Sequence, residues 1–382
     1  MNDVNRNKFR YAQRGQAFLL LVITLVLGAA AIFYSLTTAT TPEIERDRKT
    51  AEALAKAKDA LIAYASGRDS TNRPGELPCP DTNNNGTTES SCNTAASRIG
   101  RLPWATLGIP DLRDGSGERL WYAVSSNFLS SAKTTLNSNT VGEFTVTGIS
   151  PASNVIAIVF APGTVVAGQS RTTANVNNAA HYLESENASV DTTFTTAMSS
   201  GTFNDRLLAI TPAMFFPQVE MRVAREARVF LNAYFANPKI GYFPVAEAYG
   251  GGGKCVASNQ GVIPGNPASC GVKQSSWAGA GKPSWFSSEK WEEVLFYAVA
   301  PACVDPDAIN CSGAGGFLTV NGIGKLHAII IAPGVEYTAT GQIRPCATIT
   351  DCLEAPNTIS FPSFTHVPNS TTTNDRVVII AP

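Results

Sequence analysis

The pattern of apolar and polar residues differs from one part of the chain to the next, and its first feature is a long apolar run without charges. Residues 17–36 carry no charge, and a helix of that length, at about 1.5 Å per residue, crosses the roughly 30 Å core of a bilayer. Lys8, Arg10 and Arg14 precede the run, which places the N-terminus in the cytoplasm. We therefore predict a cytoplasmic leader over residues 1–15 and a transmembrane helix over 16–41. A cleaved secretory signal, the alternative, normally has a shorter apolar core.

Two later segments have the periodicity of amphipathic helices. In the segment 43–65, Leu54, Ala57 and Leu61 recur at helical spacing, so it reads as an extension of the spanning helix. In the segment 219–234, apolar residues share one helical face, and Pro217 and Pro238 bracket it. Proline is common at helix starts and just beyond helix ends. We expect a second helix there.

Each predicted helix is followed by the same series of apolar segments. Residues 120–124, 145–148, 157–163 and 204–210 are answered in the same order by residues 295–299, 318–322, 328–334 and 374–380. Both series contain an Ala-Pro-Gly turn and an Asn-Asp-Arg triplet. A shared order points to an internal duplication; the alternative is that unrelated apolar strands merely look alike.

The predicted fold class is α+β, with the transmembrane helix continuing into an amphipathic helix and two tandem units behind it. Each unit, 42–215 and 216–382, is expected to be a helix laid on an antiparallel sheet of about four strands. The most continuously apolar strands, such as residues 328–332, should lie in the middle of a sheet under the helix.

The junction between leader and apolar run carries a family resemblance. Gln13-Arg14-Gly15 followed by Gln16-Ala17-Phe18-Leu19-Leu20-Leu21-Val22 resembles the processing site of type IV prepilins and type II secretion pseudopilins. The resemblance implies that a prepilin peptidase cuts between Gly15 and Gln16. It also implies a pilin-like head and association with other pilin or pseudopilin subunits. An ordinary signal anchor remains the alternative.

Leu20 departs from that family pattern. The fifth mature position is a glutamate in most members of the family, where it is thought to pair with the terminal amine of the subunit ahead. Leu20 cannot make that contact, and some minor pilins and the large tip pseudopilin resemble this chain in lacking the acid. The resemblance therefore implies a minor or tip role; alternatively, the chain never polymerises.

All eight cysteines follow the apolar run, and their even number suggests disulfides in an oxidising compartment. Zinc is the rival interpretation, but no Cys-x-x-Cys occurs and the spacings are loose. We favour pairing between neighbours in the sequence: Cys79 with Cys92, Cys255 with Cys270, Cys303 with Cys311, and Cys346 with Cys352.

One Asx-rich segment resembles the start of a calcium loop. Asp81, Asn83 and Asn85 alternate before Gly86, and Glu89 follows, which is the oxygen-ligand spacing of such loops. Cys92 stands where the bidentate glutamate belongs, so we predict at most a weak calcium site. An Asx turn closed by a disulfide accounts for the same residues without metal.

Sequence motifs for catalysis are few. His181, His327 and His366 stand far apart, and no Gly-x-Ser-x-Gly elbow occurs. The net charge of −1 gives no basic face for nucleic acid. We therefore predict a noncatalytic minor pilin or pseudopilin of a type IV-like filament or type II secretion system, anchored in the lipid of the inner membrane with its large domain in the periplasm. The alternative is a membrane-anchored periplasmic enzyme or carbohydrate-binding protein.

Overall fold

A computed structural model describes residues 42–67, 72–132, 134–189, 191–249, 255–270, 273–305, 307, 311–312, 315–337, 341–367 and 373–381. The leader, the predicted transmembrane segment 16–41, the processing site at Gly15 and Gln16, and Leu20 lie outside these residues. None of the described helices has the length and apolar character needed to cross a bilayer. The fold class with a transmembrane helix, and the single-pass inner-membrane location, are therefore wrong as predicted.

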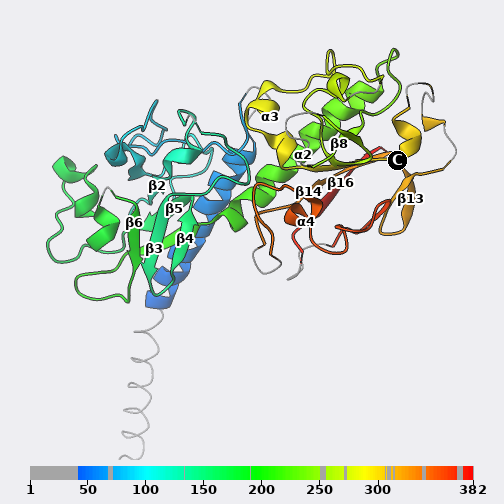
Figure 1. The fold of residues 1–382 in the computed structure, drawn as a ribbon. Helices are drawn as coiled ribbons and strands as arrows, with labels where there is room; N and C mark the ends of the chain where they lie inside the picture. Colours follow the sequence, from blue (N-terminus) through cyan, green and yellow to red (C-terminus); the bar gives the residue numbers. More distant parts are fainter. Residues whose placement is uncertain are drawn as a thin grey trace, which may run out of the picture.

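The first unit has three layers (Figure 1). A helix over residues 42–66 covers one face of a four-stranded antiparallel sheet, and a smaller sheet covers the other face. The four-stranded sheet has the order β1-β2-β5-β7, with strands at Ile99–Arg101, Trp121–Val124, Ala157–Ala161 and Arg206–Ile210. The smaller sheet has the order β4-β3-β6, with strands at Ala152–Val155, Phe144–Gly148 and Thr193–Thr196.

The second unit repeats this arrangement. Its larger sheet has the order β16-β14-β11-β10-β8-β9, with strands at Arg376–Ala381, Ala328–Ala332, Phe296–Val299, Gln260–Val262, Ala246–Glu247 and Ala257–Ser258. The smaller sheet, β13-β12-β15, comprises Ile323–Leu326, Leu318–Val320 and Ser363–Phe364. The helix α2, Pro212–Phe235, takes the place of the helix 42–66.

Shorter helices complete both units. The α-helices α3 and α4 cover Ser284–Ser288 and Ile349–Cys352. Short 3-10 helices occur at Ala95–Arg98, Ser126–Phe128, Thr173–Asn175, Ala179–His181, Ser185–Ala188, Pro267–Ser269, Trp291–Glu293 and Pro301–Cys303.

The strand pairing around the central tyrosine of each main sheet matches between the units. Tyr122 pairs with Gly100 on one side and Val159 on the other, as Tyr297 pairs with Gly261 and Ile330. Each tyrosine is fully buried and donates its hydroxyl to a proline carbonyl, 3.2 Å from Pro78 and 3.0 Å from Pro244. In both small sheets one pair of strands is antiparallel and the other parallel. The duplication therefore extends to individual contacts.

The sheet that we predicted for each unit was wrong in one respect. Residues 145–148 and 318–320 belong to the small sheets and not to the main sheets. The reason lies in the central strand β5, which is buried at every position. Ala157 and Val159 face the helix, whereas Ile158 and Phe160 face Phe194 and the rest of the small sheet. A strand that is apolar on both sides must be covered on both faces of its sheet, whereas the predicted unit had only the helix on one face.

The two units share one hydrophobic core. The first turns of α2 insert Phe215 and Phe216 against Phe128 of the first unit, and the boundary that we expected at 215/216 falls inside this helix. A largely buried ion pair is a second contact between the units: Arg73 of the first lies 3.2 Å from Glu289 of the second. The backbone N–H of Leu136 donates to the same carboxylate at 2.7 Å.

Candidate functional site

The structure contains four disulfides, and their pairing is the one that the sequence favours. Cys79–Cys92 and Cys255–Cys270 follow the helix of each unit, whereas Cys303–Cys311 and Cys346–Cys352 occur in the second unit alone. These bonds indicate that the chain folds in an oxidising setting.

The candidate calcium loop is a tight Asx turn. Asp81 is buried, and its carboxylate accepts the backbone N–H groups of Asn83, Asn85 and Gly86 at 2.6–3.3 Å. Glu89 faces the same turn and accepts from the Asn83 side chain at 2.8 Å. The predicted oxygen ligands are thus gathered in one loop, where each already accepts hydrogen bonds from the loop itself. Calcium binding stays a prediction.

The loop packs against the polar turn that precedes β2. A Cβ on Gly86 would stand 2.5 Å from the Trp104 ring, so glycine is required at this close approach. Arg119 donates to the side chain and the carbonyl of Asn84 and pairs with Asp111 at 3.0 Å. Arg113 pairs with the same aspartate. The turn therefore holds the loop through the hydrogen bonds from Arg119 to Asn84, and salt bridges to Asp111 fix Arg119 and Arg113 within the turn.

Each unit also contains a buried group of acids and amides that sequence reasoning missed. In the first, the backbone N–H groups of Asn204 and Asp205 donate to Glu184. Asp205 in turn accepts from the backbone N–H of Glu184 and the Asn187 side chain, and Gln169 donates to Glu184. We call Gln169, Glu184, Asn187 and Asp205 the first clasp. It ties the long segment after β5 to the start of β7.

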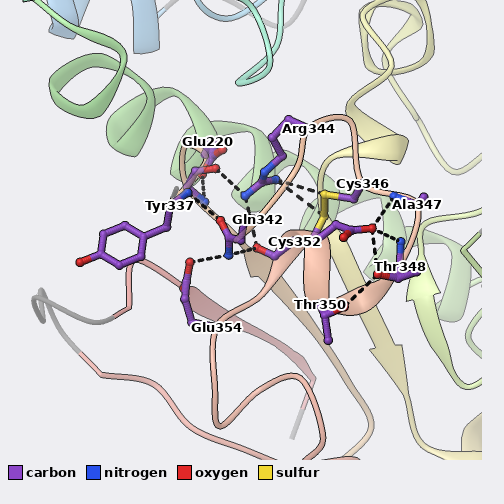
Figure 2. The surroundings of a disulfide bond; sticks show 12 residues. Glu220, Tyr337, Gln342, Arg344, Cys346, Ala347, Thr348, Thr350, Cys352 and Glu354 are labelled. Atoms are coloured by element: carbon purple, nitrogen blue, oxygen red, sulfur yellow. Dashed lines mark hydrogen bonds between the residues drawn. A yellow bond between two sulfur atoms is a disulfide. The ribbon is translucent and has the colours of Figure 1, made fainter. Parts of the chain in front are cut away.

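The second unit has the same construction. Asp375 accepts from the backbone N–H of Glu354 and the Asn357 side chain, and Gln342 donates to Glu354 at 2.7 Å. Figure 2 shows Gln342 reaching Glu354, with Arg344 lying on the Cys346–Cys352 disulfide. Gln342, Glu354, Asn357 and Asp375 form the second clasp. The repeated letters Gly-Gln-x-Arg, Leu-Glu-x-x-Asn and Asn-Asp-Arg were a signal that could have located both.

The clasps hold protons. Burial, and then the nearby charge of Glu184, raise the pKa of Asp205 to about 9. Burial and Glu354 raise the pKa of Asp375 to about 8 in the same way. Two carboxyl groups that face each other away from water cannot both ionise cheaply. One proton per clasp therefore stays bound at neutral pH.

A groove lies open beside the first clasp. Two adjoining hollows of about 370 and 440 Å³ share Thr50, Ser199, Asn204 and Arg206 in their linings. Charged side chains from the start of the helix 42–66 line one end, and Arg206 and Asp47 form a 2.8 Å ion pair there. Ile149 and Met198 line the other end and are 62% and 81% exposed. The groove thus presents apolar and charged side chains together.

The three histidines serve different parts of the fold. The Nδ1 atoms of His181 and His366 accept backbone N–H groups of Ser170 and Val377. His327 lies instead beside Cys303 and Cys311. Among the residues described, no other group of three His, Cys, Asp or Glu side chains is close enough to share a metal ion.

Comparison with known proteins assigns no family to this architecture. No family model matches the chain, and neither the curated proteins nor the solved structures contain a match.

Proposed function

We propose that the chain is a noncatalytic minor subunit of a type IV pilin-like filament or of a type II secretion pseudopilus. Its work is association with other pilin or pseudopilin subunits, in assembly or at the tip. The proposal begins from the Gln13-Arg14-Gly15 junction and the missing acid at Leu20, which lie outside the described residues.

The observation that carries the proposal in the folded part is the contact between the two units. The Glu289 carboxylate of the second unit enters a socket of the first, formed by Arg73 and the Leu136 N–H, and the Asn137 side chain donates to the Glu289 backbone carbonyl. Two like units therefore meet through unlike surfaces. Such heterologous contacts are the kind from which open, head-to-tail assemblies are built. The groove with exposed Met198 adds a surface on which a further protein can be sought.

Processing tests the first part of the proposal. The chain is expressed in a host with and without a prepilin peptidase, and the N-terminus is read by mass spectrometry. We expect a terminus at Gln16 in the first host only, and Gly15→Val should abolish it. An intact Met1 terminus in the peptidase-competent host contradicts the proposal.

Crosslinking tests the second part. A photo-crosslinking residue replaces Met198, and the chain is co-expressed with a defined set of pilin-family subunits. Ile359 in the second unit is 89% exposed and supplies a matched control position. We expect a crosslink to a pilin-family subunit from position 198 and none from 359. A chain that stays monomeric at both positions while the filament assembles argues against association.

A further inference from the structure

Two cysteines and a histidine meet at one point of the second unit. Cys303 ends the short helix Pro301–Cys303, Cys311 follows it in the sequence, and His327 stands between β13 and β14. The two sulfur atoms and a ring nitrogen of His327 all lie within 4.8 Å of one another. Cys303 is fully buried and Cys311 is 6% exposed.

The backbone holds these side chains together. The Ala300 N–H donates to the His327 carbonyl at 2.8 Å, and the Cys303 N–H donates to the Ala300 carbonyl at 2.8 Å. The rings of Phe235 and Phe317 flank the imidazole at 6.3 and 5.8 Å. The Nδ1 atom of His327 is buried and has no hydrogen-bond partner in the part of the chain that the structure describes. A buried imidazole nitrogen without a hydrogen-bond partner lowers the stability of the fold and calls for an explanation, such as a bound ion.

The duplication supplies an internal control. The backbone bond between Ala300 and His327 has its counterpart between Ser125 and Ile156 at 2.9 Å. The bond from Phe243 to Cys303 corresponds likewise to that from Leu77 to Phe128. The first unit thus places isoleucine and phenylalanine, both fully buried, where the second places His327 and Cys303. Apolar residues satisfy the fold at both positions, so packing does not explain the cysteine and the histidine.

We propose that Cys303, Cys311 and His327 form a redox-gated zinc site. A dithiol reductant reduces the disulfide, transferring two electrons and two protons and becoming a disulfide itself. Zinc then binds the two sulfurs as thiolates, with release of both thiol protons, and the imidazole is the third ligand. Reoxidation by a disulfide, which takes up the two electrons with two protons and becomes a dithiol, re-forms the Cys303–Cys311 bond and releases Zn²⁺. The inference is independent of the proposed filament role.

The site fits zinc in number and kind of ligand. Two thiolates and one imidazole match known zinc centres with three protein ligands, and a water fills the fourth position. Zn–S bonds of about 2.3 Å in a tetrahedron set the two sulfur atoms about 3.8 Å apart, so the sulfur atoms must separate after reduction. Gly315 and Gly316, both at positive φ, follow Cys311, and glycine takes up other backbone conformations at little steric cost.

Metal protection of the thiols tests the proposal on the full chain. The protein is reduced with a phosphine, zinc is added, and alkylation of each cysteine is followed by peptide mass spectrometry. We expect zinc to slow alkylation of Cys303 and Cys311 about tenfold or more and to leave Cys79 and Cys92 unaffected. Cobalt in place of zinc should give one equivalent of thiolate-to-metal charge-transfer absorption.

His327→Ile is the decisive variant, because the first unit shows that isoleucine fits this position. Loss of a ligand should weaken zinc binding at least as much as loss of an outer-shell partner, about 10–100-fold. Cys303→Ser with Cys311→Ser should abolish the cobalt signal. Equal protection in His327→Ile and the parent chain, equal protection of Cys79 and Cys92, or no protection at all overturns the proposal. A reduced chain that has unfolded gives no protection and counts against it.

Discussion

Replacing Asp205 by asparagine should make the protein less sensitive to alkaline pH. In the first clasp the Asp205 carboxyl accepts two N–H groups through Oδ2, while burial and Glu184 raise its pKa to about 9. Asparagine reproduces the protonated form, because its oxygen accepts the same two N–H groups and its amide donates toward Glu184. The variant therefore keeps the hydrogen bonds and removes the titration.

The size of the effect follows from linkage. An unfolded aspartate titrates near its ordinary pKa of 3.8, whereas the folded one keeps its proton to about pH 9. Between these values the folded state binds one more proton than the unfolded state. The contribution of this group to stability is complete below pH 3.8 and falls as pH rises, by about 1.4 kcal/mol per pH unit. From pH 5 to pH 8 the parent chain loses about 4 kcal/mol at this position, and Asp205→Asn loses none of it.

Urea unfolding of the oxidised chain at pH 5, 6, 7 and 8 measures this difference. The free energy of unfolding of Asp205→Asn should already exceed that of the parent by about 1.6 kcal/mol at pH 5, where the unfolded aspartate is ionised, and by about 4 kcal/mol more at pH 8. Asp375→Asn should behave alike up to about pH 8, the raised pKa of Asp375, and the double variant should show both gains. Asp59→Asn, at a side chain 71% exposed, is the control and should run parallel to the parent. Parallel curves for Asp205→Asn and the parent would refute the shared-proton reasoning.

Three further changes test other parts of the fold. Glu289→Ala removes the partner of Arg73 across the units and the acceptor of the Leu136 N–H, while Glu76 stays 2.7 Å from the same guanidinium. We therefore expect a loss of about 1–3 kcal/mol on urea unfolding, against little change for Glu293→Ala, whose side chain is 54% exposed. Tyr122→Phe and Tyr297→Phe each leave a buried proline carbonyl without its hydrogen-bond donor, and each should lower the free energy of unfolding by about 1–2 kcal/mol. Clearly different losses for the two variants would show that the matching strand pairing does not make the two units energetically alike. Calcium should raise the melting temperature modestly, and Asp81→Asn should remove that effect; an unchanged melting curve on chelation excludes the loop as a calcium site.

Periodicity and repetition in the sequence located both long helices and half of the described strands. The segment 43–65 is a helix over 42–66, and the apolar runs around Tyr122, Ile158, Tyr297 and Ile330 are strands at the expected places. The central strands β5 and β14 lie between neighbours in each main sheet, as their continuous apolar character indicated. These features depend on local spacing, which a sequence displays directly.

The start of α2 could not be read in the same way. We placed it at Pro217, but the helix begins at Pro212 and continues through Pro217. An interior proline costs a helix a hydrogen bond. Here the preceding turn buries Phe215 and Phe216 completely against the first unit, and this packing holds the helix through the break. The sequence shows the proline but not the aromatic partner Phe128, which is distant along the chain.

The clasps were missed for a related reason. Their members are separated by long polar stretches, and no apolar period connects Gln169 with Glu184 or Asp205. Only alignment of one half of the chain on the other shows that the same acids and amides recur at matching places. The groove beside the first clasp was equally invisible, because residues from the helix start, the small sheet and β7 all contribute to it.

The two units differ in which acidic residue binds the glycine of the Ala-Pro-Gly turn, and this difference bears on the contact between the units. In the first unit Asp114 binds the Gly163 N–H at 2.8 Å. Glu289 stands at the matching place before the second Leu-aromatic strand, but the corresponding Gly334 N–H is bound by Glu220 of α2, also at 2.8 Å. Glu220 is fully buried, and burial raises its pKa.

Because Glu220 accepts the Gly334 N–H, Glu289 does not take the role of Asp114 and instead contacts Arg73 of the first unit. Helix α2 therefore makes two contributions. Its Glu220 binds the Gly334 N–H, and its Phe215 and Phe216 pack against the first unit. The first helix has Thr50 where α2 has Glu220, counting back from Tyr64 and Tyr234, and Thr50 accepts the Gly115 N–H at 2.9 Å instead. Asp114 of the first unit thus binds a backbone N–H of its own unit, whereas Glu289 of the second unit binds Arg73 of the first.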